Sequence, residues 1–369
     1  MDRLGARGDG AVRRLALGLL ALAMAACAPV QQGRLKGAFE GGPSFVAKDG
    51  EANGWFETFD GAKLGLSIWR PEPAPAAVSG SCAAAACGPA EDLLAAPPPV
   101  IIAVHGMNDY AGAFNGAGAW WSAHGAIVYA YDQRGFGRSP RAGIWPEHEL
   151  MRQDLRTAVA VARRMHPGST IAVVGESMGA SVAITAFASD TPPAADVLVL
   201  SGPGLYGWGA LPILYSVSLW TSAHVRPSWI VTPPKGVRIT PTDNIDKQIE
   251  MWKDPNVLKT TRIDSVYGVV SIMEEADRMI AKLTPNVPAL LLYGARDEVI
   301  PEFGVRKATS RLPEHVKTAY YARGYHMLMN DKQATTVWSD VLAFVEDPKS
   351  PVASGSPPLP WRPSHAGQP

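Results

Sequence analysis

Short runs of apolar residues recur along the chain from about residue 100 onward, separated by helical patterns. Runs that are apolar throughout are expected to be strands of a parallel sheet, because helices cover both faces of such strands. They lie at 99–104, 126–131, 171–174, 197–200, 289–293 and 316–321. Helices are predicted near 113–124, 146–165, 180–187 and 335–345. This alternation predicts an α/β fold with a mostly parallel, doubly wound sheet and right-handed crossovers.

The pattern before residue 100 is less regular. Two strands are predicted within 55–70, around a turn at Asp60-Gly61. Residues 71–99 are rich in Ala and Pro and are predicted to form a surface insertion between strands. Gly and polar residues dominate 28–51, which we interpret as a tether. The predicted domain therefore covers 52–346, and the Pro/Ser/Gly-rich residues 347–369 are predicted to be disordered.

Residues 202–284 interrupt the alternation, after the sixth predicted strand. The first third of this segment is rich in large apolar residues, and the remainder has a helical pattern. Ligands of open α/β sheets bind outside the carboxyl ends of the strands, where this insertion would begin. We therefore predict a mainly helical cap, or lid, over the site. The alternative is that these residues only extend the core.

The first 27 residues have the pattern of an export signal. Four arginines precede an apolar run at 15–26, which is too short to cross a bilayer comfortably. Met24-Ala-Ala-Cys27 resembles a bacterial lipobox, in which the Cys is acylated and becomes the mature N-terminus. The resemblance implies a lipoprotein signal peptide over 1–27 and an anchored protein in the cell envelope. Ala28 favours the outer membrane, facing the periplasm. The alternatives are cleavage near Ala26 without lipidation, and an uncleaved anchor.

Composition narrows the function classes. The 369 residues contain 34 Lys+Arg and 34 Asp+Glu, so the formal net charge is zero. This balance argues against a nucleic-acid partner, which would require a basic surplus or stripe. Besides Cys27, the chain contains Cys82 and Cys87, which are candidates for a short-loop disulfide in an exported protein. No His cluster suggests a metal site, and we expect neither a metal nor a cofactor.

The strongest chemical signal is Gly175-Glu-Ser-Met-Gly179, which lies between the predicted strand 171–174 and the predicted helix 180–187. A strand, a tight turn and a helix form the context in which G-x-S-x-G is a nucleophile elbow. The turn holds the Ser in a strained conformation, and larger side chains at the two glycines would collide with neighbouring elements. Ser177 is therefore the candidate nucleophile. The alternative is an ordinary Ser in a Gly-rich turn.

A nucleophilic Ser requires a base and an acid that orients the base. In elbow-containing enzymes the chain order is Ser, acid, His, each after a later strand. Asp297 follows the predicted strand 289–293, and His326 follows the strand 316–321. These residues are the candidate acid and base. Glu298 is the rival acid, and an ordinary turn Asp and a structural His are the alternatives for Asp297 and His326.

An acyl-transfer site also requires two backbone N–H groups that stabilise the developing oxyanion. One donor is expected from Met178, which follows the nucleophile at a helix N-terminus. The other is expected from Met107, in the loop after the strand 99–104. His105 lies at the start of this loop, and we interpret it as a structural histidine rather than a base.

Together these motifs resemble the serine hydrolases of the α/β-hydrolase superfamily. The most similar subgroup is the monoacylglycerol lipase / lysophospholipase group, whose domain is called serine aminopeptidase S33. The resemblance covers about 52–345 and rests on five segments: His105-Gly106, Asp132-Gln-Arg-Gly-Phe-Gly-Arg-Ser139, Gly175–Gly179, Gly294-Ala-Arg-Asp297 and Gly324-Tyr-His326. It implies the roles assigned above, favours Asp297 over Glu298, and implies hydrolysis of monoacylglycerol- or lysophospholipid-like esters through an acyl-enzyme on Ser177.

Two positions depart from the family pattern. Glu176 stands where the family usually has His, and Met107-Asn108-Asp109 replaces a run of small residues after His-Gly. Neither change affects the triad, but both bear on substrate choice. Asp254-Pro255, within the predicted cap, is also reminiscent of the subgroup.

The same triad is compatible with several acyl-transfer reactions, so it does not identify the reaction by itself. Peptidase, thioesterase and acyltransferase functions therefore remain open, and a C–C hydrolase is a weaker candidate. A dehalogenase is disfavoured because it would need Asp in place of Ser177. A different class is a non-catalytic envelope lipoprotein that keeps the fold as a scaffold, although a scaffold has no need of a complete triad.

Overall fold

A computed structural model describes residues 29–37, 39–47, 53–72, 96–232 and 238–362. The predicted signal peptide with Cys27, the pair Cys82 and Cys87, and most of the predicted insertion 71–99 lie outside these ranges. Within them, no helix has both the length and the apolar character needed to cross a membrane.

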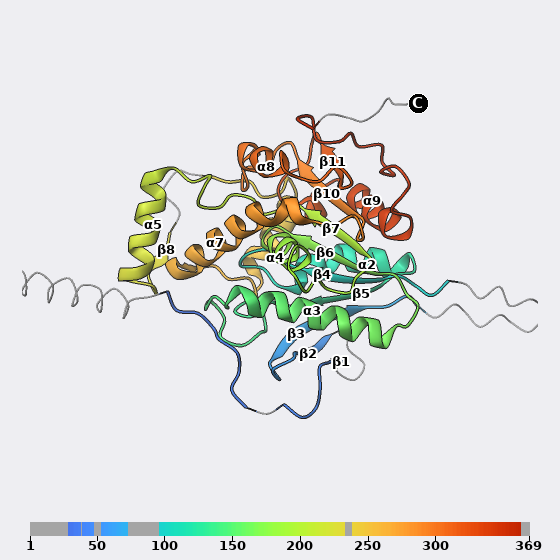
Figure 1. Ribbon diagram of the computed structural model, residues 1–369, viewed down its shortest axis with the longest axis horizontal. Helices are drawn as coiled ribbons and strands as arrows, with labels where there is room; N and C mark the ends of the chain where they lie inside the picture. The colour runs from blue at the N-terminus through green and yellow to red at the C-terminus, as the bar shows by residue number, and fades with distance from the viewer. Residues whose placement is uncertain (1–28, 38, 48–52, 73–95, 233–237, 363–369) are drawn as a thin grey trace, which may run out of the picture.

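The centre of the described structure is one sheet of nine strands (Figure 1). Their order is β1-β2-β3-β5-β4-β6-β7-β10-β11. The strands are β1 (Ser44–Ala47), β2 (Asn53–Glu57), β3 (Lys63–Trp69), β4 (Val100–Val104), β5 (Ile127–Tyr131), β6 (Ile171–Glu176), β7 (Val197–Ser201), β10 (Ala289–Gly294) and β11 (Lys317–Tyr321). The pairs from β5 to β11 are parallel, whereas β1, β2 and β3 are antiparallel to their neighbours. The predicted fold class is confirmed.

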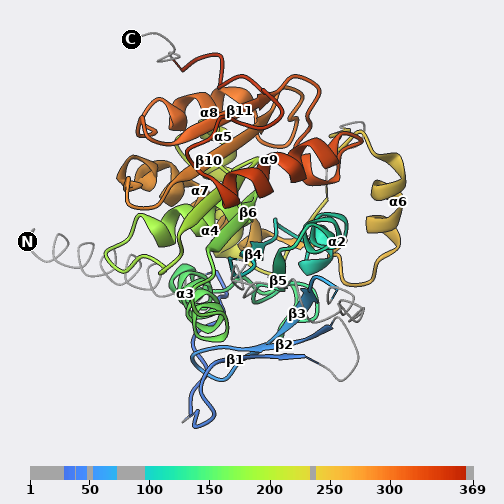
Figure 2. The ribbon, with the colours of Figure 1, turned by 90° about the vertical axis from the view of Figure 1, so that its right-hand side faces the viewer.

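Helices cover both faces of the sheet, as Figure 2 shows. One face carries α3 (His148–Met165), α4 (Met178–Phe187) and α7 (Ile263–Met279), and the other carries α2 (Asn115–Ala123) and α9 (Ala334–Glu346). Strand β4 explains this arrangement, because all five of its residues are buried. Ile102 belongs to the core that includes Leu155 of α3, whereas Ile101 packs in the opposite core with Trp121 of α2. Alternate side chains therefore serve opposite layers.

The segment between β7 and β10 is mainly helical, as predicted. It contains α5 (Ile213–Val225), the short strands β8 (Ile230–Val231) and β9 (Thr261–Arg262), α6 (Ile245–Lys253) and α7. Helix α5 extends away from the sheet at the left of Figure 1. By contrast α7 packs on α4, and its Ile272 and Ala276 are fully buried. Helix α7 therefore extends the core, which was the alternative to a cap for this segment. The cap consists of the elements before α7.

The predicted tether 28–51 is wrong for residues 44–47, which form β1. Because β1 adds a strand to the count, the cap segment 202–284 follows the seventh strand of the chain, not the sixth. Phe45 stabilises this edge strand: its ring stacks on Tyr129 at 4.5 Å and meets Phe56 edge-on at 5.2 Å. Four residues between polar and Gly-rich stretches give too short a pattern to reveal a strand, so tertiary packing decides the structure here.

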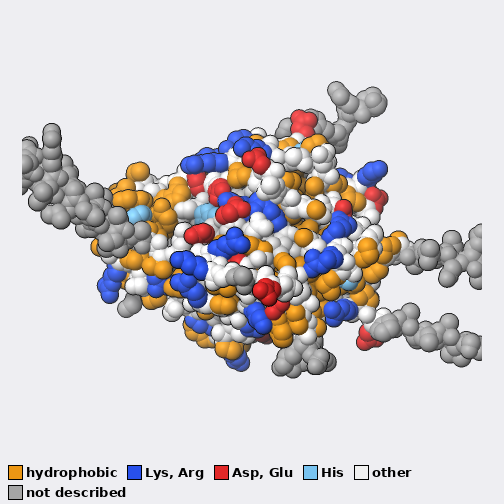
Figure 3. Space-filling view, turned by 60° about the horizontal axis from the view of Figure 1, so that its bottom comes forward, with side chains coloured by type: hydrophobic (Ala, Val, Ile, Leu, Met, Phe, Trp, Pro, Cys, Tyr) orange, Lys and Arg blue, Asp and Glu red, His pale blue; other side chains and the backbone are white. Residues whose placement is uncertain are grey.

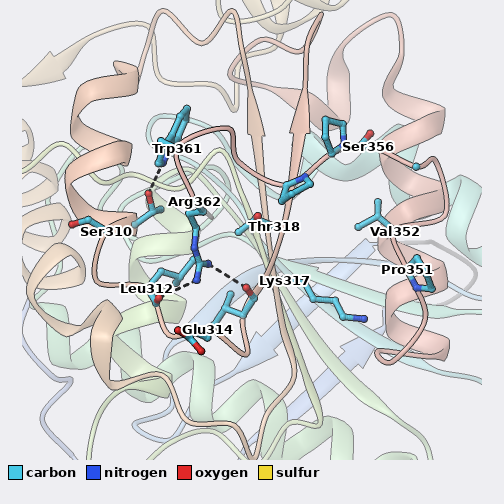
Figure 4. Close-up of a pocket in the computed structure, with 15 residues that line it drawn as sticks. Ser310, Leu312, Glu314, Lys317, Thr318, Pro351, Val352, Ser356, Trp361 and Arg362 are labelled. Carbon is cyan, nitrogen blue, oxygen red and sulfur yellow. Dashed lines mark hydrogen bonds between the residues drawn. The ribbon is translucent and has the colours of Figure 1, made fainter. Parts of the chain in front are cut away.

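The predicted disordered tail 347–369 is wrong for its described residues. The segment runs beside the edge strand β11, where Tyr320 N–H donates to the carbonyl of Pro357 at 2.7 Å. Leu359 is fully buried, and its N–H donates to Thr318 Oγ1 at 3.1 Å. The Arg362 guanidinium points at the carbonyl of Leu312, 3.1 Å away (Figure 4). Proline removes N–H donors but leaves carbonyl acceptors, so a Pro-rich segment can still cover a sheet edge.

Candidate active site

Ser177 occupies a strained turn between β6 and α4. Its φ of 53° and ψ of −116° lie outside the regions that non-glycine residues usually adopt. The surroundings hold this turn: Ser177 N–H donates to the carbonyl of Ser201 at 2.9 Å, and Gly204 N–H donates to the carbonyl of Ser177 at 3.0 Å. The turn thus projects the hydroxyl beyond the carboxyl end of β6, as a nucleophile elbow requires.

The two elbow glycines have the steric role inferred from the sequence. A Cβ at Gly179 would lie 2.1 Å from the carbonyl oxygen of Val104, and a Cβ at Gly175 would lie 2.7 Å from that of Gly179. Both separations are far below van der Waals contact with backbone atoms. The glycines therefore allow α4 to pack directly against β4 and the turn.

Ser177, His326 and Asp297 form one chain of hydrogen bonds. Nε2 of His326 lies 2.8 Å from Ser177 Oγ, and Nδ1 of His326 lies 2.8 Å from Asp297 Oδ2. The other oxygen of Asp297 accepts hydrogen bonds from the amides of Val299 and Ile300, at 2.9 and 2.8 Å. These bonds fix the carboxylate, which then holds the imidazole with its proton on Nδ1 and leaves Nε2 free to accept the serine proton.

The sheet order explains why residues 149 positions apart meet. Strands β6, β7, β10 and β11 are consecutive neighbours and all parallel, so their carboxyl ends share one edge. The loops after β10 and β11 are also tied together, because Arg296 N–H donates to the carbonyl of Gly324 at 2.8 Å. This bond fixes the position of the loop that carries Asp297 relative to the loop that carries His326.

The amides proposed as oxyanion donors lie on either side of the nucleophile. Met178 is the first residue of α4, and Met107 follows Gly106 in the loop after β4. A Cβ at Gly106 would lie 3.2 Å from Ser177 Cβ, so this loop passes close to the serine. In the described ranges we find no hydrogen bond from either amide. Both N–H groups are therefore available to a developing oxyanion.

His105 is buried and holds the same loop, as predicted from the sequence. Its Nε2 accepts a hydrogen bond from the amide of Gln133 at 2.8 Å, and its Nδ1 lies 2.7 Å from the carbonyl of Gly106. These partners assign the ring proton to Nδ1. Burial lowers the pKa of His105 to about 4, despite the opposing charge of Asp132. A neutral histidine with both nitrogens engaged is a structural group.

The Asp132–Ser139 motif is a second structural device. Asp132 Oδ1 accepts from the amide of Ala111 at 2.9 Å, and its Oδ2 accepts from Nε of Arg138 at 2.8 Å. Arg134 forms buried ion pairs with Asp60 at 2.7 Å and with Asp154 at 2.6 Å. These contacts join the loop after β5 to the helical turn η1 (Ala111–Phe114), to the turn between β2 and β3, and to α3.

Ser177 opens into a cavity of about 210 Å³. Its lining residues come from the catalytic loops and from the cap: Gly106, Met107, Asp109, Glu176, Ser177, Pro241, Met251, Val299, His326 and Met327. Pro241 and Met251 carry no signal in the sequence, because the helical pattern of the cap does not indicate which side chains reach the cavity. In the sequence, Asp109 stands out only as part of a departure from the family pattern.

Besides Ser177 and His326, the lining contains two carboxyl groups, those of Glu176 and Asp109. Burial, reinforced by Asp109 and Asp331, raises the pKa of Glu176 to about 8. Burial also raises the pKa of Asp109 to about 6, although the amide of Tyr110 partly opposes the shift. Across the described ranges, no group of three or more His, Cys, Asp or Glu residues is arranged to hold a metal ion.

The fold and the geometry of this site are those of the α/β-hydrolase class. The family model named serine aminopeptidase, S33, matches residues 95–333, which is more than half of the chain. The chain belongs to this family, as the motifs predicted.

Relatives of known name are similar over most of their length. The monoacylglycerol lipase of Mycolicibacterium smegmatis is 27% identical over 264 residues, covering 68% of this chain and 88% of the relative. The human monoglyceride lipase is 21% identical over 269 residues, covering 71% of this chain and 87% of the relative.

Solved structures agree on the fold. The Paleococcus ferrophilus monoacylglycerol lipase superposes with a TM-score of 0.56 at 19% identity, covering 76% of this chain and 98% of that chain. The Saccharomyces cerevisiae monoglyceride lipase, in complex with a substrate analogue, superposes with a TM-score of 0.59 at 16% identity. The match covers 80% of this chain and 94% of that chain.

Proposed function

We propose that this protein is a carboxylic ester hydrolase that cleaves monoacylglycerol-like lipids. The observation that carries the proposal is the hydrogen-bonded chain Ser177–His326–Asp297, with both contacts at 2.8 Å, beside a largely apolar cavity. The names of the relatives support the substrate class. Lysophospholipids are the finer alternative within it.

The mechanism follows from the positions of these groups. His326 removes the proton from Ser177 Oγ as the oxygen attacks the ester carbonyl, and the amides of Met107 and Met178 stabilise the oxyanion. His326 then donates the proton to the departing alcohol, which leaves an acyl group on Ser177. A water molecule, activated by the same histidine, attacks the acyl-enzyme and releases the fatty acid.

The cap supports a lipid substrate. Several large apolar side chains of α5 are exposed, among them Ile213, Leu214 and Val217. Figure 3 shows hydrophobic side chains gathered at the cap end of the molecule, on the left. Beneath them lies an apolar cavity of about 390 Å³, whose lining includes Leu219, Trp229 and Val266. Exposed apolar surface of this kind suits contact with a lipid aggregate.

We also propose that Cys27 is acylated and anchors the domain in the bacterial envelope, at the outer membrane facing the periplasm. The lipobox-like sequence Met24–Cys27 motivates this proposal. The first described residues run beside the start of α7: Gln32 Nε2 donates to the carbonyl of Ile144 at 2.5 Å, and Gly143 in the same loop accepts from Ser265 Oγ at 3.0 Å. An anchor there would hold the cap end near the membrane.

The test of the enzymatic proposal is hydrolysis of monoacylglycerols and p-nitrophenyl esters of graded chain length, by the wild type and by Ser177→Ala. We expect turnover by the wild type only, and labelling of Ser177 by a fluorophosphonate probe. Activity that survives the substitution would refute the nucleophile assignment. Aminoacyl p-nitroanilides and acyl thioesters in the same panel test the peptidase and thioesterase alternatives. An unlabelled, inactive wild type would support the scaffold.

The anchor is tested separately by fractionating cells that express the wild type or Cys27→Ala. The substitution should move the protein from the membrane to the soluble fraction. Unchanged fractionation would refute lipidation at this position. The pairing of Cys82 with Cys87 stays a prediction, and thiol alkylation with and without a reductant measures it.

A further inference from the structure

Glu176 is a buried acid that the mechanism above does not use. Only 2% of the residue is exposed, yet it lines the cavity and immediately precedes Ser177. Its Oε1 is buried without a partner, and among the described residues we find no hydrogen bond to either carboxyl oxygen. A buried polar atom without a hydrogen-bond partner destabilises the folded protein. This cost is offset when a ligand in the cavity supplies the missing partner.

The charged groups around Glu176 determine its protonation state. Asp109, from the loop after β4, lines the same cavity, and Asp331 follows the turn η3 (Leu328–Asn330). Both negative charges disfavour ionisation of Glu176, as burial does, whereas Lys247 on α6 favours it. His326 lines the cavity as well. Burial and the two acids prevail, with a resulting pKa of about 8, so the group is mostly uncharged at neutral pH.

An uncharged carboxyl group has a specific recognition chemistry. It offers one O–H donor and one carbonyl acceptor, which together match a hydroxyl group, and it has no net charge to attract an ammonium ion. The acyl chain of a lipid ester provides neither donors nor acceptors to satisfy it. In a monoacylglycerol-like ester, the free hydroxyl groups belong to the alcohol part.

We propose that Glu176 is a specificity-determining residue that hydrogen bonds a hydroxyl group on the alcohol part of the ester, beside Ser177. This inference rests on the proposed ester hydrolase function and deepens it. Met107, Met251 and Met327 contribute apolar side chains to this cavity, and Glu176 and Asp109 contribute its two carboxyl groups. Glu176 thereby favours esters of polyhydric alcohols over esters of simple alcohols.

A dependence on pH follows from the same arrangement. Ionisation removes the O–H donor of Glu176 and introduces a negative charge next to the place where the oxyanion develops. Both effects disfavour the transition state. Turnover of the hydroxyl-bearing ester should therefore fall as the pH rises through about 8.

The experiment compares two esters of octanoic acid, the monoacylglycerol and the methyl ester, with the wild type, Glu176→Gln and Glu176→Leu. The wild type should prefer the glycerol ester. Glu176→Leu should lower kcat/KM for the glycerol ester about 10- to 100-fold, the effect of losing a buried hydrogen bond, and change that for the methyl ester less than about 3-fold. Glu176→Gln keeps a donor and an acceptor at every pH, so it should retain the preference and lose the alkaline decline.

Asp331→Asn is the matched control. Its carboxyl group acts on Glu176 through charge and does not line the cavity. The amide can still accept the hydrogen bond from Tyr325 N–H, now at 2.8 Å. Removing this negative charge should move the alkaline decline to lower pH and leave the preference for glycerol unchanged. A decline that does not move would show that another group titrates, and would overturn the assignment to Glu176.

Other outcomes are equally decisive. An equal loss on both esters in Glu176→Leu would assign Glu176 a merely structural role. Octanoylcholine, as a third ester, tests for a charged Glu176: a wild-type preference for it that is lost in Glu176→Gln would mean that Glu176 binds a cation, and would overturn the proposal. A wild type that hydrolyses neither ester would contradict the proposed function itself. If Glu176→Leu fails to fold, judged by fluorophosphonate labelling of Ser177, the pH profile of Glu176→Gln decides: a persisting alkaline decline overturns the proposal.

Discussion

The carboxylate of Asp297 lies 2.8 Å from Nδ1 of His326, whereas the adjacent Glu298 serves a different contact. Oε2 of Glu298 accepts a hydrogen bond from the amide of Thr240 in the cap, at 2.7 Å. Asp297 is further fixed by two backbone amides. Two neighbouring acids that the sequence made rivals thus have separate roles, one in orienting the histidine and one in holding the cap.

The first prediction separates these two acids. Asp297→Asn should lower kcat by about 10⁴-fold, the effect of the same change in the serine-protease triad, because Asn favours the wrong histidine tautomer. Glu298→Gln should leave kcat within a few-fold, because the amide oxygen can still accept from Thr240. Steady-state kinetics on a p-nitrophenyl ester measures both. A damaging Glu298→Gln and a harmless Asp297→Asn would reverse the assignment.

The second prediction concerns stability and pH at His105. Its pKa is about 4 in the folded protein, against a reference of 6.5. Between these values the unfolded chain binds more protons, so His105 contributes stability above about pH 6.5 that is lost as the pH falls toward 4. The loss is on the order of 3 kcal/mol.

Urea unfolding at several pH values tests this contribution. The free energy of unfolding of the wild type should exceed that of His105→Gln most at neutral pH, and the difference should shrink toward pH 4. A difference that stays constant between pH 7.5 and 4 would contradict the account of a buried, neutral His105.

The triad could be predicted from the sequence because each of its residues lies in a short recognisable motif, and these motifs follow one another in a fixed order along the chain. Gly175 and Gly179 mark the elbow, and Asp297 and His326 each follow an apolar run that forms a parallel strand. Parallel strands bring their carboxyl ends to one edge, so the chain order alone brings these side chains together.

The lining of the cavity depends on geometry that no local pattern encodes. Pro241 and Met251 reach it only because of how the cap folds over the loops. Glu176 is visible in the sequence as a departure from the family pattern, but its role depends on Asp109 and Asp331, which come from two other loops. Similarly, β1 and the C-terminal segment were missed because their order comes from packing partners such as Tyr129 and Thr318, not from their own composition.

The third prediction tests whether the C-terminal segment is part of the folded domain. Leu359 is fully buried beside β11, so Leu359→Ala should lower the free energy of unfolding by about 2–4 kcal/mol. Leu35→Ala is the control, because Leu35 is 49% exposed and its truncation should change stability by less than about 0.5 kcal/mol. Chemical denaturation measures both. Equal, small effects would mean that residues 351–362 do not pack in solution.

The fourth prediction concerns the apolar surface of α5. Leu214 is 80% exposed, so its side chain adds nothing to the core, but it would be buried by contact with a lipid aggregate. Burying a leucine side chain contributes about 1.5–3 kcal/mol. Leu214→Asp should therefore weaken binding of the untethered domain to phospholipid vesicles about 10- to 100-fold, and slow hydrolysis of long-chain monoacylglycerol presented in them.

Two comparisons make the cap result specific. Hydrolysis of a water-soluble p-nitrophenyl acetate should not change in Leu214→Asp, because α5 contributes no residue to the cavity at Ser177. Phe303→Asp replaces an apolar side chain that is 54% exposed on α8 (Glu302–Thr309), outside the cap, and should leave vesicle binding unaltered. Equal losses in the two variants would indicate a general effect of added negative charge. Unchanged binding in both would exclude α5 as the lipid-contacting surface.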